Sequence, residues 1–221
     1  KLATAQSAAA TLVDTLFKLP GTTALNPNVK AGLVPFDFYV NVGTTYRGAS
    51  WLTNTTDYSV TNAPTCSNTY PDKKLISHVW TTATCKSDGV PYDCSRYVDT
   101  YDYGTAVKVC NNGSTSNYKW YGCVGSQPSP YDIGEIANAT NPVPGMLNVS
   151  CSSPLIRLTN DAAALKKAIA ATKAANETYI APALMWAWRL LSPNSPFSGD
   201  AGAYGAAQKT IVLMTDGANT H

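Results

Sequence analysis

The stretch that decides the fold prediction reads Lys209-Thr210-Ile211-Val212-Leu213-Met214-Thr215-Asp216-Gly217. Its central run, 211–214, is wholly apolar, which is typical of a strand buried on both faces in a parallel sheet covered by helices. Asp216 follows this predicted strand directly, and Gly217 permits a tight turn there. In open α/β sheets, ligands bind beyond the carboxyl ends of the strands, so Asp216 is a candidate site residue. An Asp-Gly pair is also an ordinary turn, so it identifies no site by itself.

Two helices are predicted before this strand. Apolar residues recur at helical spacing at Leu158, Ala162, Leu165 and Ile169. They predict a helix over about 161–174, which Thr159 or Asn160 can cap. A second helix, about 181–191, is apolar nearly all round and is therefore expected to be buried. Thr178 comes just before this helix. If the fold brings the Thr178 hydroxyl and the Asp216 carboxylate together above the sheet, they are suitable ligands for Mg²⁺ or Ca²⁺.

The beginning of the chain is also regular. Its apolar residues predict an amphipathic helix of about four to five turns, which Leu19-Pro20-Gly21 ends. Residues 29–42 are expected to form one strand or two short ones, because Pro35 cannot continue a central ladder. The order of helix, strand, insert, helix, helix, strand indicates an α/β fold. Its core is predicted at 1–43 and 159–221, interrupted by an insertion over 44–158.

All six cysteines lie inside that insertion, which is rich in Gly, Asn, Ser, Thr and Tyr and contains short strand-like pieces. They are Cys66, Cys85, Cys94, Cys110, Cys123 and Cys151. An even number confined to one such segment favours disulfides over metal-bound or free thiols, and six cysteines allow fifteen pairings. The histidines, His78 and His221, complete no metal motif. Disulfides predict an oxidising compartment: the periplasm, the cell surface or the outside.

Composition excludes some function classes. The 221 residues include 16 basic and 14 acidic ones without a basic patch, so nucleic-acid binding is not expected. The longest apolar stretch, Tyr179–Leu191, is too short to span a bilayer. His78 has no evident catalytic partner. The tyrosines between Tyr92 and Tyr103 fit two interpretations equally: an adhesive face, or ordinary strand residues.

The last third of the chain resembles a known family. Residues 178–193 read Thr-Tyr-Ile-Ala-Pro-Ala-Leu-Met-Trp-Ala-Trp-Arg-Leu-Leu-Ser-Pro, and with Pro196-Phe197 and 209–220 they look like the von Willebrand factor A domain of TadG-like pilus-assembly proteins. Residues 33–43, 120–124 and Cys151 resemble other parts of that family. The resemblance implies a three-layer, Rossmann-like domain with a long disulfide-rich insertion containing short strands. It also favours pairing Cys123 with Cys151.

The resemblance further implies a metal-ion-dependent adhesion site. Thr178 matches its second ligand element and Asp216 its third, while the first element, Asp-x-Ser-x-Ser, has no counterpart because the chain begins inside the first helix. The sequences that begin at Asp57 and Asp93 are similar to this element, but both lie in the insertion and are excluded as ligands. Mg²⁺ or Ca²⁺ is therefore expected to bind the complete domain, and to bind this fragment weakly or not at all.

The function that follows is a noncatalytic, extracytoplasmic binding module of a TadG-like protein. A pilus or envelope protein would be its partner, possibly through an acidic side chain placed on the bound ion. The parent protein is expected to be anchored in the inner membrane through a segment absent from this chain. Two alternatives are a secreted metal-dependent hydrolase using Asp216, and a structural domain with a degenerate metal site.

Overall fold

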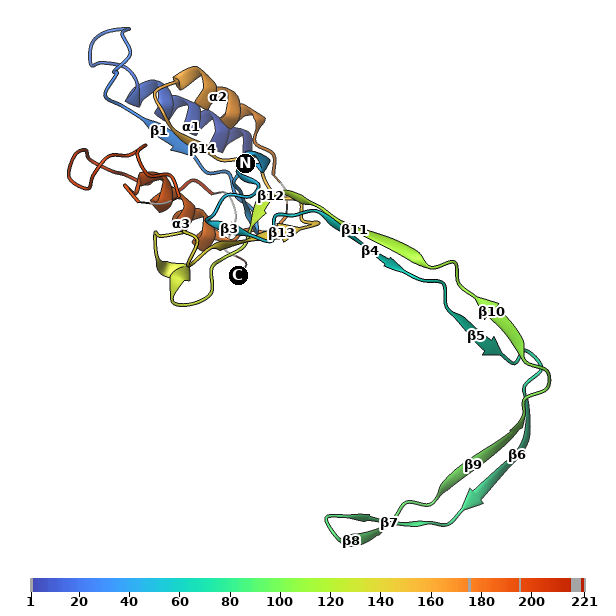
Figure 1. The fold of residues 1–221 in the computed structure, drawn as a ribbon. Helices are drawn as coiled ribbons and strands as arrows, with labels where there is room; N and C mark the ends of the chain where they lie inside the picture. The colour runs from blue at the N-terminus through green and yellow to red at the C-terminus, as the bar shows by residue number, and fades with distance from the viewer. Residues whose placement is uncertain (1, 175, 195, 216–219, 221) are drawn as a thin grey trace. The chain divides into compact units, whose positions relative to one another are not determined.

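The computed structural model describes residues 2–174, 176–194, 196–215 and 220, and the chain divides into two compact units (Figure 1). The first unit comprises Lys1–Tyr58 and Asn117–His221, and the second comprises Ser59–Ser116. The predicted insertion, 44–158, contains the whole second unit. The remaining parts of the insertion, 44–58 and 117–158, belong to the first unit.

The helices of the described residues all lie in the first unit. They are α1 (Leu2–Leu16), α2 (Ala162–Ala171) and α3 (Ile180–Leu191), with short 3₁₀ helices η1 (Thr44–Tyr46) and η2 (Tyr131–Ile133). All three α-helices match the predicted ones to within a few residues. The N-cap of α2 differs from the prediction, because the Asp161 side chain accepts the N–H of Ala164 at 2.9 Å. Thr159 instead accepts the N–H of Asp161.

The strands of the first unit form two small sheets. One holds β1 (Ala31–Leu33) and β14 (Ile156–Thr159), which pair antiparallel. The other has the order β2 (Val40–Asn41), β12 (Trp120–Val124), β13 (Val143–Leu147) and β3 (Leu52–Thr53). In this second sheet only β13 and β3 run parallel.

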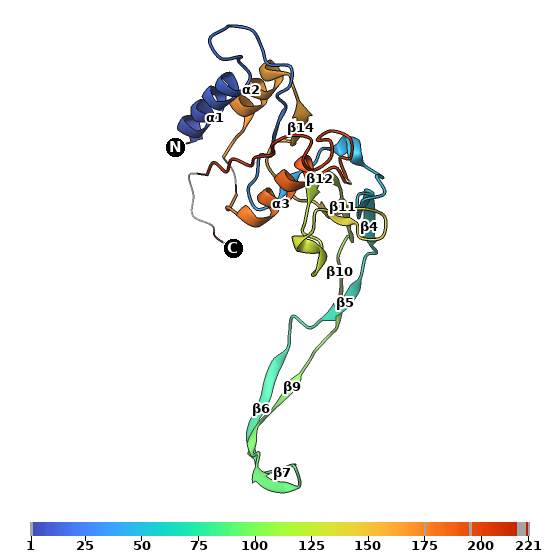
Figure 2. The ribbon, with the colours of Figure 1, turned by 90° about the vertical axis from the view of Figure 1, so that its left-hand side faces the viewer.

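The packing of these elements gives the first unit two apolar clusters. Helices α1 and α2 lie side by side over β1 and β14, and α3 contacts the same strand pair from the other side (Figures 1 and 2). Val13, Phe17, Leu165 and Ile169 form the smaller cluster, between α1 and α2. The larger cluster lies around the four-stranded sheet and includes Trp51, Trp120, Trp186 and Phe197. Burial of these rings is the main driving force for folding the unit.

The predicted three-layer, Rossmann-like fold is wrong. The structure consists mostly of small antiparallel strand pairs, and no parallel sheet covered by helices is present among the described residues. Residues 211–214 form no strand, and Ile211, Val212 and Leu213 are 42%, 54% and 43% exposed. An apolar run becomes a central strand only where neighbouring strands are available on both sides. The run itself carries no information about those neighbours.

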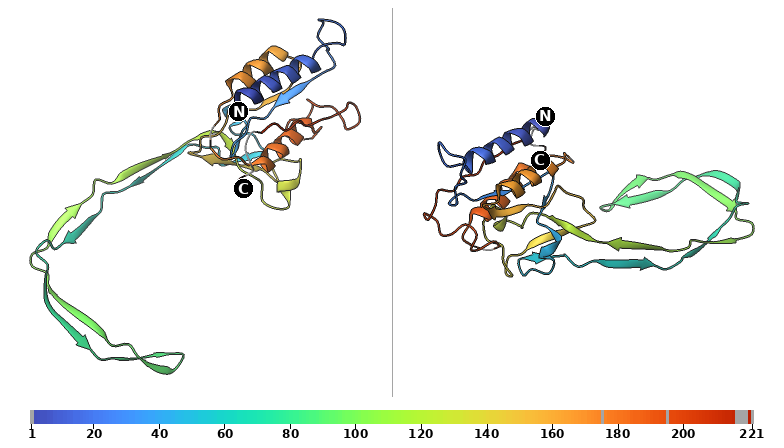
Figure 3. Two further views of the ribbon diagram at one scale, coloured as in Figure 1. Left: turned by 180° about the vertical axis from the view of Figure 1, so that it is seen from behind. Right: turned by 90° about the horizontal axis from the view of Figure 1, so that it is seen from above.

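The second unit is a two-stranded antiparallel ribbon, visible from two further directions in Figure 3. Along it, β5 (Cys66–Thr69) pairs with β10 (Val107–Cys110), β6 (Lys74–Thr81) with β9 (Arg96–Asp102), and β7 (Thr84–Ser87) with β8 (Val90–Asp93). Strands β4 (Tyr58–Asn62) and β11 (Ser114–Tyr118) form one more pair. Asp88 and Gly89 join β7 to β8 with φ of 49° and 82°, as a type I′ hairpin turn requires.

Candidate functional site

Thr178, the predicted second metal ligand, lies in the segment before α3. Its carbonyl oxygen accepts the backbone N–H of Thr220 at 3.0 Å, and its own N–H donates to the Thr220 hydroxyl at 3.2 Å. Asp216, the predicted third ligand, lies outside the described residues. The convergence of Thr178 and Asp216 therefore stays a prediction.

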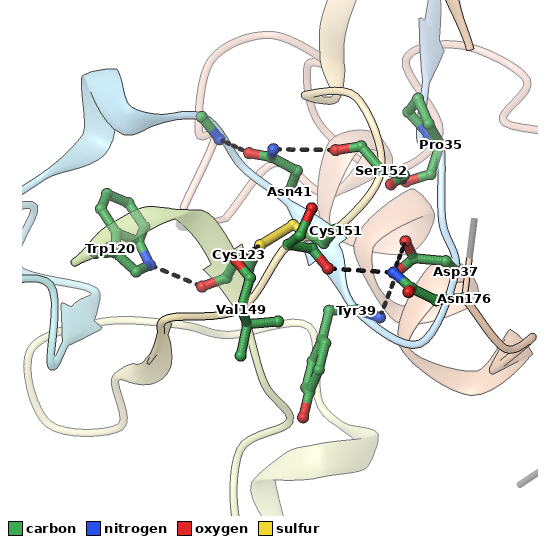
Figure 4. Close-up of a disulfide and its surroundings, with 12 residues drawn as sticks. Pro35, Asp37, Tyr39, Asn41, Trp120, Cys123, Val149, Cys151, Ser152 and Asn176 are labelled. Carbon is green, nitrogen blue, oxygen red and sulfur yellow. Dashed lines mark hydrogen bonds between the residues drawn. A yellow bond between two sulfur atoms is a disulfide. The ribbon is translucent and has the colours of Figure 1, made fainter. Parts of the chain in front are cut away.

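A buried carboxylate, that of Asp37, lies next to this segment in space although it is far away along the chain. Asp37 is 4% exposed, and its carbonyl oxygen accepts the N–H of Tyr179 at 3.0 Å. One carboxylate oxygen accepts the N–H of Tyr39 at 2.9 Å, and the other accepts the side-chain amide of Asn176 at 3.0 Å. Figure 4 shows Asp37 and Asn176 pointing toward one another beside the Cys123–Cys151 disulfide. Asp37 thus orders the segment that leads to α3.

Asp37 and Thr178 by themselves offer few free oxygen ligands to a divalent cation. Both carboxylate oxygens of Asp37 are engaged by protein donors, whereas Mg²⁺ and Ca²⁺ need about six oxygen ligands. Over the described ranges, no three side chains of His, Cys, Asp or Glu come together as ligands for a metal.

All six cysteines are paired, as predicted. The disulfides are Cys66–Cys110, Cys85–Cys94 and Cys123–Cys151. Cys123–Cys151, the pair that the family resemblance favours, belongs to the first unit. The other two disulfides link the two strands of the ribbon. Three disulfides indicate an extracellular or periplasmic environment. Within the described residues, no helix has both the length and the apolar character needed to cross a bilayer.

The most unusual surface of the chain lies on the pair β6·β9. Nearly every side chain of the two strands is exposed, although many are apolar or aromatic. Side chains two positions apart share a face of a strand, and residues directly opposite share it across the pair. One face therefore carries His78, Trp80, Tyr97, Asp99 and Tyr101, which we call the aromatic face.

The rings of the aromatic face hold one another in place. His78 stacks on Tyr97 with centroids 4.2 Å apart, and Trp80 meets Tyr97 edge-on at 4.9 Å. Trp80 is nevertheless 52% exposed and Tyr97 is 57% exposed. A large apolar surface that is already ordered loses little conformational entropy when a partner covers it. Such a surface is suited to binding.

A polar network runs through the same face. His78 Nδ1 lies 2.5 Å from Asp99 Oδ1, and the Tyr101 hydroxyl donates to Asp99 Oδ2 at 3.2 Å. The hydrogen bond from His78 lowers the pKa of Asp99, and the hydrogen bond to Asp99 raises the pKa of Tyr101. Lys73 Nζ lies 3.7 Å from the centre of the Tyr101 ring, a cation–π contact. These contacts fix the orientations of the side chains on the aromatic face.

The sequence indicated this site only in part, because the tyrosines between Tyr92 and Tyr103 fitted an adhesive face and ordinary strand residues equally and His78 had no evident partner. The partner of His78 is Asp99, 21 positions away, and the two meet only because the β6·β9 register places them opposite one another. The Asp-Gly turn at 88–89 is a local signal for this contact, since a hairpin centred there brings residues 78 and 99 close together. A bulge at Ile76 changes the register further along, and no pattern in the sequence marks it.

Comparison with known proteins identifies no relative. No family model, curated protein or solved structure matches the chain. The resemblance of residues 178–193 and 209–220 to TadG-like proteins therefore stays a prediction.

Proposed function

We propose that this chain is a noncatalytic binding module that acts outside the cytoplasm, and that the ribbon carries its partner-binding surface. The observation that carries the proposal is the aromatic face, in which Trp80 and Tyr97 are ordered by their neighbours yet more than half exposed. Large exposed apolar patches on a protein surface mark sites of interaction.

The rest of the ribbon supports the same function. A two-stranded hairpin is only marginally stable alone in water, and this one is held by two disulfides. Residues 59–116 contain five basic and five acidic residues, so the ribbon has no net charge with His78 neutral. A neutral apolar surface favours a protein partner over a polyanion such as nucleic acid. The TadG-like resemblance names the class of partner: a pilus or envelope component.

The test removes the ribbon and leaves the first unit. Tyr58 and Tyr118 stack at 4.6 Å, and strands β4 and β11 pair, so the two segments of the chain run side by side at this point. A variant in which Asn-Gly replaces residues 60–116 can therefore close the hairpin with a type I′ turn. The full chain should sediment with purified pili or envelope fragments, whereas this variant should keep its circular dichroism spectrum and lose at least tenfold in affinity.

A double substitution tests whether the aromatic face, rather than another part of the ribbon, binds the partner. The double variant Trp80→Ser, Tyr97→Ser should also lose binding. The matched control, Val79→Ser, Val98→Ser, changes the opposite face of the same strand pair and should retain binding. Binding that survives both the deletion and the double variant would exclude the ribbon as the binding surface.

A further inference from the structure

Strand β9 has a nearly palindromic sequence. From Arg96 to Asp102 it reads Arg-Tyr-Val-Asp-Thr-Tyr-Asp. Around Asp99 at its centre, the residues at equal distances are two β-branched residues, two tyrosines and, at the ends, a pair of opposite charges. A strand of this kind is complementary to a second copy of itself that runs antiparallel.

One edge of β9 is open. The ribbon at this point has only two strands, and β9 pairs with β6 alone. In the described part of the chain no backbone group bonds to the other edge of β9. Seven residues of unpaired backbone edge are a template for another strand. The edge contains no proline and no bulge that would block pairing.

We propose that two copies of the chain pair through β9, antiparallel about a two-fold axis at Asp99. The product is a four-stranded sheet in which β9 of each copy is central and β6 is outermost. This inference deepens the proposed function, because it names a second copy of the chain as a partner of the ribbon.

Charge complementarity selects this register. Arg96 lies opposite the partner's Asp102, and the symmetry repeats the contact. Arg96 forms no ion pair with any described residue of its own chain. The neutral ribbon adds no net repulsion between copies. The two Asp99 carboxylates on the axis do repel, but each is already hydrogen-bonded by His78 and Tyr101 of its own chain.

The side chains also match across the axis. Tyr97 lies opposite the partner's Tyr101, so the aromatic faces of the two copies join into one surface. Val98 lies opposite the partner's Thr100. Pairing of seven residues buries less than the roughly 800 Å² per partner of a typical stable interface. We therefore expect a weak dimer that forms at concentrations on the order of 10 μM and above, or at lower ones where copies are held together.

Sedimentation velocity over a wide range of concentrations tests the dimer. Arg96→Asp and Asp102→Arg each place like charges opposite one another twice, and each should weaken the dimer roughly tenfold. The combination Arg96→Asp, Asp102→Arg restores both pairs and should dimerise within about threefold of the native chain. Asp99→Asn removes the repulsion at the axis and should strengthen the dimer. All three positions are exposed, so folding should be unchanged.

Cross-linking tests the register directly. Asp99→Cys places two thiols opposite one another on the axis and should give a covalent dimer under mild oxidation. Val79→Cys on β6 is also exposed and should not. A chain that stays monomeric at several hundred micromolar, or a dimer that is indifferent to the charge exchange, would overturn the inference. If the chain stays monomeric but the ribbon still binds envelope fragments, the proposed function stands and only the dimer is excluded. If the chain dimerises but binds no envelope fragments, the dimer stands and only the proposed function fails.

Discussion

Asp57 and Trp120 lie 63 positions apart, yet the Asp57 carboxylate accepts the backbone N–H of Trp120 at 2.9 Å. The same carboxylate oxygen lies 2.7 Å from Nη1 of Arg47, whose Nη2 donates to the carbonyl oxygen of Trp120. Asp57 belongs to the stretch whose lettering mimics a metal-binding loop. These contacts give Asp57 a structural role. They connect the end of the segment 1–58 to the start of β12, and both belong to the first unit.

Asp57 should contribute to stability in a pH-dependent way. The hydrogen bond from Trp120, followed by the one from Arg47, lowers the pKa of Asp57. A carboxyl group whose pKa is lower in the folded state stabilises the fold above its unfolded pKa, near 3.9, and loses this contribution as the pH falls through the folded value. Urea denaturation of Asp57→Asn should therefore show a lower midpoint than the native chain at pH 7, and a difference that shrinks toward pH 2. An equal difference at both pH values would contradict this assignment.

Two tryptophans on α3 should differ sharply in their contribution to folding. Trp186 is 1% exposed and lies 5.9 Å from the ring of Trp51, whereas Trp188 is 38% exposed. Trp186→Ala should lower the free energy of unfolding by about 3–5 kcal/mol, because it leaves a cavity in the larger cluster. Trp188→Ala, the matched control, should cost about 1 kcal/mol or less. Equilibrium denaturation followed by circular dichroism measures both, and similar losses would show that the burial of α3 is misassigned.

The disulfides of the two units should each stabilise only their own unit. Replacing Cys123 and Cys151 by alanine opens a loop between residues 28 positions apart and should cost the first unit about 3 kcal/mol. Replacing Cys85 and Cys94 should leave the unfolding of the first unit unchanged, because that pair lies in the ribbon. Thiol titration of the unreduced, denatured chain should find no free thiol. A free thiol would contradict the extracytoplasmic environment.

Divalent cations should bind the chain poorly. Of the ligands that the family resemblance implies, only Thr178 and Asp216 are present, and two oxygens cannot replace the roughly six that Mg²⁺ prefers. Isothermal titration should show no saturable binding of Mg²⁺ or Ca²⁺ at submillimolar concentrations. Saturable binding that Thr178→Val or Asp216→Asn abolishes would instead establish a metal site and restore the ion-mediated mode of partner binding.

Local features of the sequence determined several parts of this protein. The spacing of Leu165 and Ile169 predicted α2, because an amphipathic period has the same meaning wherever the helix packs. The Asp-Gly pair at 88–89 marked a turn, since Asp and Gly tolerate the positive φ that they adopt there. The confinement of six cysteines to one segment predicted disulfides and an oxidising compartment.

The tertiary structure alone decided which segments pair. Residues 211–214 have the composition of a central strand but form no strand, and Ile211, Val212 and Leu213 are exposed, because a strand needs neighbours that its own sequence does not specify. The contact of His78 with Asp99 depends on a register that one bulged residue can shift. Helical period and turn chemistry are local properties of the chain, so they can be read from sequence. Strand pairing, and with it the aromatic face, depends on contacts between distant residues.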